Sequence, residues 1–135
     1  MRVLVTRSAP GDQTSVAALL ERGVTAISSP VLQTEFCAPA EPDWNGVQAL
    51  LVTSAAAAIA VQSYTGAKTL PVLAVGDQTA AACVKAGFAD VRSAQGDAED
   101  LLALASTVPA DGGRIMYLRG ADVAHDLAAA LEGRG

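Results

Sequence analysis

The sequence has few of the side chains from which metal and nucleophile sites are built. Among its 135 residues there is one histidine, His125, and there are two cysteines, Cys37 and Cys83, far apart in the chain. Zinc sites need several Cys or His ligands at close spacing, so neither a metal nor a metal cofactor is expected. We expect the two cysteines to be reduced, packed thiols of a cytoplasmic protein, and His125 to lie on a helix surface.

Positive charge and long apolar runs are also scarce. Nine Lys and Arg residues stand against fourteen Asp and Glu, and the net charge is −5. Proteins that bind nucleic acid generally carry the opposite charge balance, so a nucleic-acid partner is not expected. No apolar run reaches the ~18 residues of a membrane-spanning helix, and so no membrane contact is expected either.

The common catalytic motifs are missing as well. The sequence contains no GxSxG, HExxH, GxGxxG or Walker phosphate-binding loop. It does contain a high share of hydrophobic residues, 51%, with only 17% charged residues. This composition predicts a folded chain that buries a core.

Short apolar runs alternate with longer amphipathic stretches along the chain. Strands are predicted over residues 2–6, 24–27, 47–53, 72–75, 90–92 and 114–118, and helices over 11–22, 55–64, 78–86, 98–106 and 122–132. Strand–helix alternation with short joins is typical of an α/β fold. We therefore predict a mostly parallel sheet with helices on both faces.

Several helix ends carry recognisable signals. Asp12 and Ser54 are predicted N-caps, and Asp97 opens a helix whose first turn is acidic. Gly23 is predicted to end the first helix, whose apolar face would include Leu20.

A stretch rich in proline and acidic residues interrupts the alternation between residues 31 and 44. It predicts an extended connector and a domain boundary. The chain also ends directly after a helix, at Gly135, whereas the helix that Gly23 ends is followed by a strand. We therefore expect the chain to be part of a longer protein, in which the open edge of an incomplete sheet would promote self-association.

Candidate binding groups lie in the turns that follow the predicted strands. Four of these turns are small and polar or contain glycine, and each precedes a helix: residues 6–8, 53–55, 76–79 and 119–120. Exposed N–H groups and hydroxyls in such turns suit an anionic ligand, to which Arg7 and Arg119 would add positive charge. In the alternative interpretation, Ser54 and Thr79 only cap helices and the arginines are solvated.

These turns, in their order and spacing over essentially the whole chain, resemble the uroporphyrinogen-III synthase family. The matching pieces are Val5-Thr6-Arg7, residues 51–54, 74–80 and 117–120, Gly87-Phe88, residues 96–102 and the Leu127-xxx-Leu131 pair. The resemblance implies two α/β domains with a cleft between them. Residues 1–33 would begin the first domain, which is incomplete here, and residues 34–135 would form the connector and most of the second domain.

The resemblance implies that the chain closes the linear tetrapyrrole hydroxymethylbilane to uroporphyrinogen III, with inversion of ring D and loss of water, in haem biosynthesis. It implies no cofactor. The substrate-binding groups that it implies are the side chains of Ser54 and Thr79, the backbone N–H groups of Ala55, Gly76 and Gln78, and the guanidinium groups of Arg7 and Arg119.

Two departures from the family pattern leave the catalytic residues unassigned. Ala56 stands where members often have Asn, and neither Tyr64 nor Tyr117 matches the tyrosine suspected of helping the hydroxyl to leave. Two other functions therefore stay open. One is a non-catalytic α/β module that binds another anionic metabolite, and the other is a truncated, inactive synthase-like chain.

Overall fold

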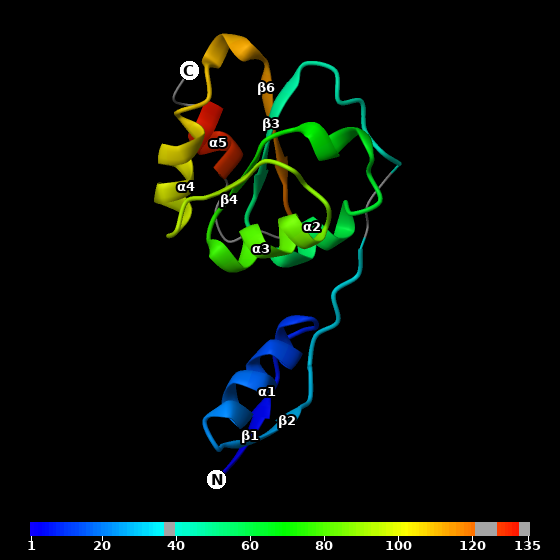
Figure 1. The fold of residues 1–135 in the computed structure, drawn as a ribbon, viewed down its shortest axis with the longest axis vertical. Coiled ribbons are helices and arrows are strands. Elements are labelled where there is room, and N and C mark those ends of the chain that lie inside the picture. The colour runs from blue at the N-terminus through cyan, green and yellow to red at the C-terminus, as the bar shows by residue number, and fades with distance from the viewer. Residues whose placement is uncertain (37–39, 121–126, 133–135) are drawn as a thin grey trace. The chain divides into compact units, whose positions relative to one another are not determined.

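The computed structural model describes residues 1–36, 40–120 and 127–132. It divides the chain into two units, Met1–Cys37 (unit 1) and Ala38–Gly135 (unit 2), as Figure 1 shows. The predictions for Cys37 and His125, and for the start of the helix expected from residue 122, lie outside the described residues.

Unit 1 is a β–α–β segment. Strand β1 (Arg2–Val5) pairs in parallel with β2 (Thr25–Ser28), and helix α1 (Gly11–Glu21) connects them. Gly23 ends this helix with a positive φ of 73°, as predicted, because glycine adopts the left-handed conformation without steric cost. The prediction for Leu20 is wrong. Leu20 is 55% exposed, so it does not lie on the buried face of α1 in unit 1.

The predicted capping role of Asp12 is also wrong. Helix α1 begins at Gly11, its N-cap is Pro10, and Asp12 lies inside the first turn with 3% of its surface exposed. Its Oδ2 atom accepts a hydrogen bond of 2.6 Å from Ser28 Oγ at the end of β2 and one from the Gln13 amide. The bond from Ser28 is the main cause of a lowered Asp12 pKa. Asp12 thus joins α1 to β2 and does not cap its own helix.

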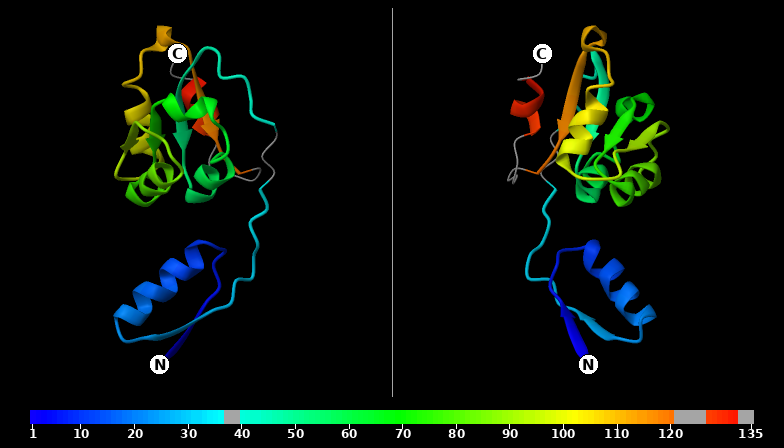
Figure 2. Two further views of the ribbon diagram at one scale, coloured as in Figure 1. Left: turned by 45° about the vertical axis from the view of Figure 1, so that its right-hand side comes forward. Right: turned by 90° about the vertical axis from the view of Figure 1, so that its left-hand side faces the viewer.

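Unit 2 contains, within the described residues, a four-stranded parallel sheet in the order β5-β4-β3-β6. Its strands are β3 (Val47–Val52), β4 (Val72–Ala74), β5 (Val91–Ser93) and β6 (Arg114–Leu118). Its helices are α2 (Ala55–Ala60), α3 (Asp77–Lys85), α4 (Ala98–Ala105) and α5 (Leu127–Glu132), with short 3-10 helices η1 (Gly66–Thr69) and η2 (Ala110–Gly112). The helices lie on both sides of the sheet in Figure 2, which confirms the predicted α/β fold.

The core of unit 2 lies on both faces of the central strand β3. Leu50 packs on one face with Cys83 of α3, and Leu51 packs on the other with Leu101 of α4. All four side chains are fully buried, as expected for a parallel strand that is covered on both sides. The prediction that Cys83 is a packing residue is therefore confirmed.

Helix α2 is shorter than predicted. It ends at Ala60, whereas the sequence suggested a helix to residue 64. The chain turns after Val61, and the Tyr64 ring is buried with its centroid 6.0 Å from that of Trp44. Tyr64 thus lies outside the helix and packs on a residue twenty positions earlier. The 3-10 helices η1 and η2 were likewise not predicted.

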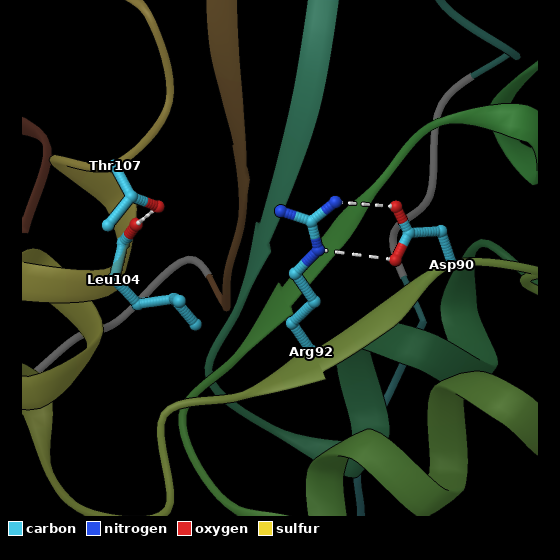
Figure 3. A network of polar contacts seen from close by, with 4 residues as sticks. All are labelled: Asp90, Arg92, Leu104 and Thr107. Carbon is cyan, nitrogen blue, oxygen red and sulfur yellow. Dashed lines mark hydrogen bonds and ion pairs between the residues drawn. The ribbon is translucent and has the colours of Figure 1, made fainter.

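Strand β5, at one edge of the unit 2 sheet, carries an exposed ion pair. Arg92 donates from Nη2 to Asp90 Oδ2 at 3.0 Å and from Nε to Oδ1 at 3.3 Å, as Figure 3 shows. In the same view the Thr107 hydroxyl donates to the Leu104 carbonyl at the end of α4 (2.7 Å). Charged side chains on an edge strand oppose pairing with another chain, although an exposed pair adds little stability.

Candidate functional site

The carboxyl ends of the unit 2 strands meet at one edge of the sheet, because all four strands are parallel. The turn with Ser54 follows β3, the turn with Gly76 follows β4, and Arg119 follows β6. Strand β3 lies between β4 and β6, so the fold brings these three predicted positions to one edge. We call this edge of unit 2 the carboxyl edge.

Ser54 caps α2, as the sequence predicted. Its backbone is extended, and its Oγ atom accepts a hydrogen bond of 3.2 Å from the Ala57 N–H group. A serine hydroxyl has two lone pairs and one hydrogen, so this cap leaves the hydrogen for another acceptor. The side chain is exposed, and Ala55 begins the helix directly after it.

The N-terminus of α3 has a different structure, because Gly76 is its N-cap and offers no side-chain acceptor. The first backbone bond of the helix runs from Ala80 N–H to the Gly76 carbonyl at 2.9 Å. The N–H groups of Asp77, Gln78 and Thr79 precede that bond, so they have no partner within the helix. They form, with the helix dipole, a site that suits an anion.

The side chains of α3's first turn contribute unequally to this site. Gln78 is exposed, whereas Thr79 has only 7% of its surface exposed. A role of the Thr79 hydroxyl toward the substrate therefore stays a prediction. Asp77 is an exposed carboxylate in the same turn, and it weakens the attraction for an anionic ligand.

Helix α4 begins at the same edge but satisfies its own N-terminus. The Asp97 carboxylate accepts from the N–H groups of Glu99 (2.8 Å) and Asp100 (3.4 Å), and Asp100 accepts in return from Asp97 N–H (3.0 Å). The prediction that these acidic residues begin a helix is confirmed. The acidic start of α4 therefore differs from the start of α3, whose N-cap residue supplies no side-chain acceptor.

Arg7, the remaining predicted position, belongs to unit 1. Its Nη1 atom donates to Ser15 Oγ at 3.2 Å, so the guanidinium group lies along α1. A Cβ atom on Gly11 would come within 2.5 Å of Arg7 Nε, and the glycine therefore leaves room for this side chain. A role of Arg7 toward the substrate stays a prediction.

One polar contact at the carboxyl edge was not predicted. Thr53 Oγ1 and the Tyr117 hydroxyl oxygen lie 3.3 Å apart, between the end of β3 and strand β6. The sequence contains both residues, but it does not show that β6 is the neighbour of β3. The strand order is therefore the missing signal.

The described residues, 1–36, 40–120 and 127–132, offer neither a metal-binding cluster nor a membrane-spanning helix. In that part of the chain no three His, Cys, Asp or Glu side chains lie where they could share a metal ion. The helices described there are also too short or too polar to cross a bilayer.

The fold and the edge together define an α/β protein with uncapped N–H groups and hydroxyls at the carboxyl ends of parallel strands, an arrangement suited to carboxylates. The chain belongs to the uroporphyrinogen-III synthase family, because the family described as Uroporphyrinogen-III synthase HemD matches residues 13–135. The comparison with curated proteins gives no match. The family match confirms the resemblance, supports a synthase-like role in tetrapyrrole biosynthesis, and indicates a small tetrapyrrole as the substrate.

Proposed function

We propose that the chain acts in the closure of hydroxymethylbilane to uroporphyrinogen III, as a lyase that releases water and inverts ring D. The observation that carries this proposal is the uncapped N-terminus of α3 beside the hydroxyl-bearing turn after β3. The family match supports it, because it covers both of these turns.

The substrate is a flexible polycarboxylate, and its chemistry explains what such an edge would do. The hydroxyl group takes up a proton from solvent and leaves as water, which gives a cationic, azafulvene-type carbon. The substituted carbon of ring D attacks this carbon to form a spirocyclic intermediate. The original link of ring D then breaks, and the ring closes again at its free carbon with loss of a proton, which inverts ring D. The bilane is reactive without help, so the protein's task is to hold it in the folded geometry that forms the type III ring. Fixed N–H and O–H donors can do this without an acid–base residue, because they bind the carboxylates that surround the reacting rings.

Each group would have a separate task in this proposal. The N–H groups of Gln78 and its neighbours in α3 would bind one carboxylate, and the Ser54 hydroxyl, with the Ala55 N–H group, would bind another. Arg119, exposed after β6, would add a positive charge. Arg7, which lies in unit 1, would add a further positive charge for a substrate carboxylate, and the proposed domain boundary falls between residues 33 and 34.

The test is the isomer that the chain produces from freshly prepared hydroxymethylbilane. Without enzyme the bilane closes to the type I ring, so separation of the type I and type III products measures the activity directly. Type III product that increases with protein concentration is expected. A product mixture that stays type I at every protein concentration would refute the activity for this chain.

The alternative functions are separated by a binding measurement on the same sample. Uroporphyrin III, the stable oxidised form of the product, carries the same carboxylates and can be titrated against the protein. Binding without type III product would favour an inactive synthase-like chain, and absence of binding would favour a module for a different anion. Sedimentation of the same sample tests the expected self-association, and a strictly monomeric species would contradict that expectation.

A further inference from the structure

Two hydroxyl groups at the carboxyl edge have no part in the function proposed above. Thr53 Oγ1 lies 3.3 Å from the Tyr117 hydroxyl oxygen, and either atom can be the donor. Thr53 follows β3 and directly precedes the Ser54 cap, whereas Tyr117 lies on β6. The contact therefore joins neighbouring strands at the place where the ligand-binding turns begin.

Packing fixes the Tyr117 ring in this position. Tyr117 is opposite Leu51 in the β3–β6 register, and its half-buried ring packs on the cluster that contains Leu51 and Leu101. Thr53 comes two residues after Leu51, so the alternation of the strand brings its side chain to the same face. The ring is thus anchored in the core of unit 2 while its hydroxyl reaches a partly exposed threonine.

We propose that Tyr117 is a positioning residue, which directs the hydroxyl hydrogen of Thr53 toward a carboxylate of the substrate; this inference rests on the proposed function. Each hydroxyl has a single hydrogen. When Tyr117 donates to Thr53 Oγ1, the hydrogen of Thr53 is left for a ligand, and the two bonds polarise each other in the same direction. Thr53 then adds an oriented donor beside the Ser54 hydroxyl.

A purely structural role predicts a different result. If the contact only joins β3 to β6, its loss lowers the stability of unit 2 and leaves ligand binding by the folded chain unchanged. The experiment therefore compares Tyr117→Phe, Thr53→Val and the double variant under conditions in which each is fully folded. Its readouts are the dissociation constant for uroporphyrin III and the fraction of type III product formed from hydroxymethylbilane.

The matched control is Tyr64→Phe, which removes the same hydroxyl from the other tyrosine of the chain. Tyr64 packs against Trp44 in the core cluster on the opposite face of the sheet. This variant is expected to bind uroporphyrin III as the wild type does, even where its melting temperature changes.

We expect Tyr117→Phe and Thr53→Val each to weaken uroporphyrin III binding about three- to tenfold, the range that follows from one oriented hydrogen bond. The double variant should be no weaker than the weaker single variant, because both changes remove one coupled unit. Unchanged binding in folded Tyr117→Phe, or strictly additive losses, would overturn the inference.

The outcome for the wild-type chain separates the two proposals. If it binds uroporphyrin III but forms only the type I ring, the synthase proposal fails, and the binding cycle still decides the role of Tyr117. If it binds no uroporphyrin III and forms only the type I ring, both proposals are overturned.

Discussion

Replacement of Gly76 by aspartate should stabilise the protein and weaken the proposed binding of a substrate carboxylate. Gly76 has φ −156° and ψ 173°, an extended conformation open to any residue. A Cβ atom there would meet only the Gly96 carbonyl oxygen, at 3.9 Å, which is an ordinary contact. Asp97 of α4 shows what an aspartate does at this position, because its carboxylate accepts from two N–H groups of its own helix.

The two effects have opposite signs, and each can be given a size. A carboxylate cap in place of glycine, together with its attraction to the helix dipole, should stabilise unit 2 by about 1 kcal/mol. For a part of this size, that raises the melting temperature by about 4–8 °C. A ligand carboxylate bound at the same N–H groups would lie about 5 Å from the carboxylate that the substitution introduces. At that distance, with screening by solvent, the repulsion between the two carboxylates amounts to about 1–3 kcal/mol. Affinity should therefore fall about five- to a hundredfold.

The assay combines thermal unfolding, followed by fluorescence of Trp44, the single tryptophan, with titration of uroporphyrin III and measurement of the product isomers. Gly76→Asn is the matched control, because asparagine caps the helix without a charge. It should weaken binding less than Gly76→Asp does. If Gly76→Asp is more stable but binds and cyclises as the wild type does, no substrate carboxylate lies at the N-terminus of α3, and the proposed binding mode is refuted.

Three further predictions follow from individual side chains. Asp77→Asn removes a like charge from the first turn of α3, so affinity for uroporphyrin III should rise about two- to fivefold; an unchanged affinity would argue against binding there. Hydrogen bonds, first from Trp44 and then from the Gly66 N–H group, hold the pKa of Glu41 below its ordinary value of 4.5. This carboxylate therefore stabilises the fold above about pH 4.5 and less as the pH falls through its folded pKa, so Glu41→Gln should flatten the acid side of the stability–pH curve. Burial raises the pKa of Cys83 to about 11. In a variant without Cys37, a thiol reagent at pH 8 should react at least about a hundredfold more slowly with the native chain than with the urea-unfolded chain, and similar rates would contradict this burial.

Local features of the fold could be predicted because neighbouring residues determine them. Ser54 and Asp97 cap the helices that they precede, and Gly23 ends a helix with positive φ. In each case the stabilising contact lies within a few residues of the signal. The alternation of these elements was then sufficient to predict the parallel sheet.

Features that depend on contacts between distant residues could not be predicted. Asp12 resembles an N-cap in sequence, but its partner is Ser28, sixteen residues later. The contact of Tyr117 with Thr53 requires the strand order β5-β4-β3-β6, which is not the order of the chain. Which side chains pair across neighbouring strands depends on the order of the strands in the sheet. A single sequence does not reveal that order.

At the opposite edge of the unit 2 sheet, where the strands begin, side chains donate hydrogen bonds to backbone carbonyl groups. Gln48 Nε2 donates to the carbonyls of Pro109 (2.9 Å) and Gly113 (2.6 Å). Lys68 Nζ donates to the Ala86 carbonyl (2.8 Å) just after α3 and lies 4.0 Å from the centre of the Phe88 ring. These contacts satisfy carbonyl groups at loops and helix ends, so their effect is on stability.

The start of α3 lacks a comparable contact from its N-cap residue, although the fold has room for one. Any cap at Gly76 would stabilise the helix, and α4 demonstrates such a cap in the same sheet. The protein is therefore less stable with glycine at position 76 than it would be with a capping residue there. The lower stability has a physical reason if a ligand supplies the acceptor for the N–H groups at the start of α3. A capping side chain would compete with that ligand for the same N–H groups. The opposite changes in stability and affinity expected for Gly76→Asp measure that competition directly.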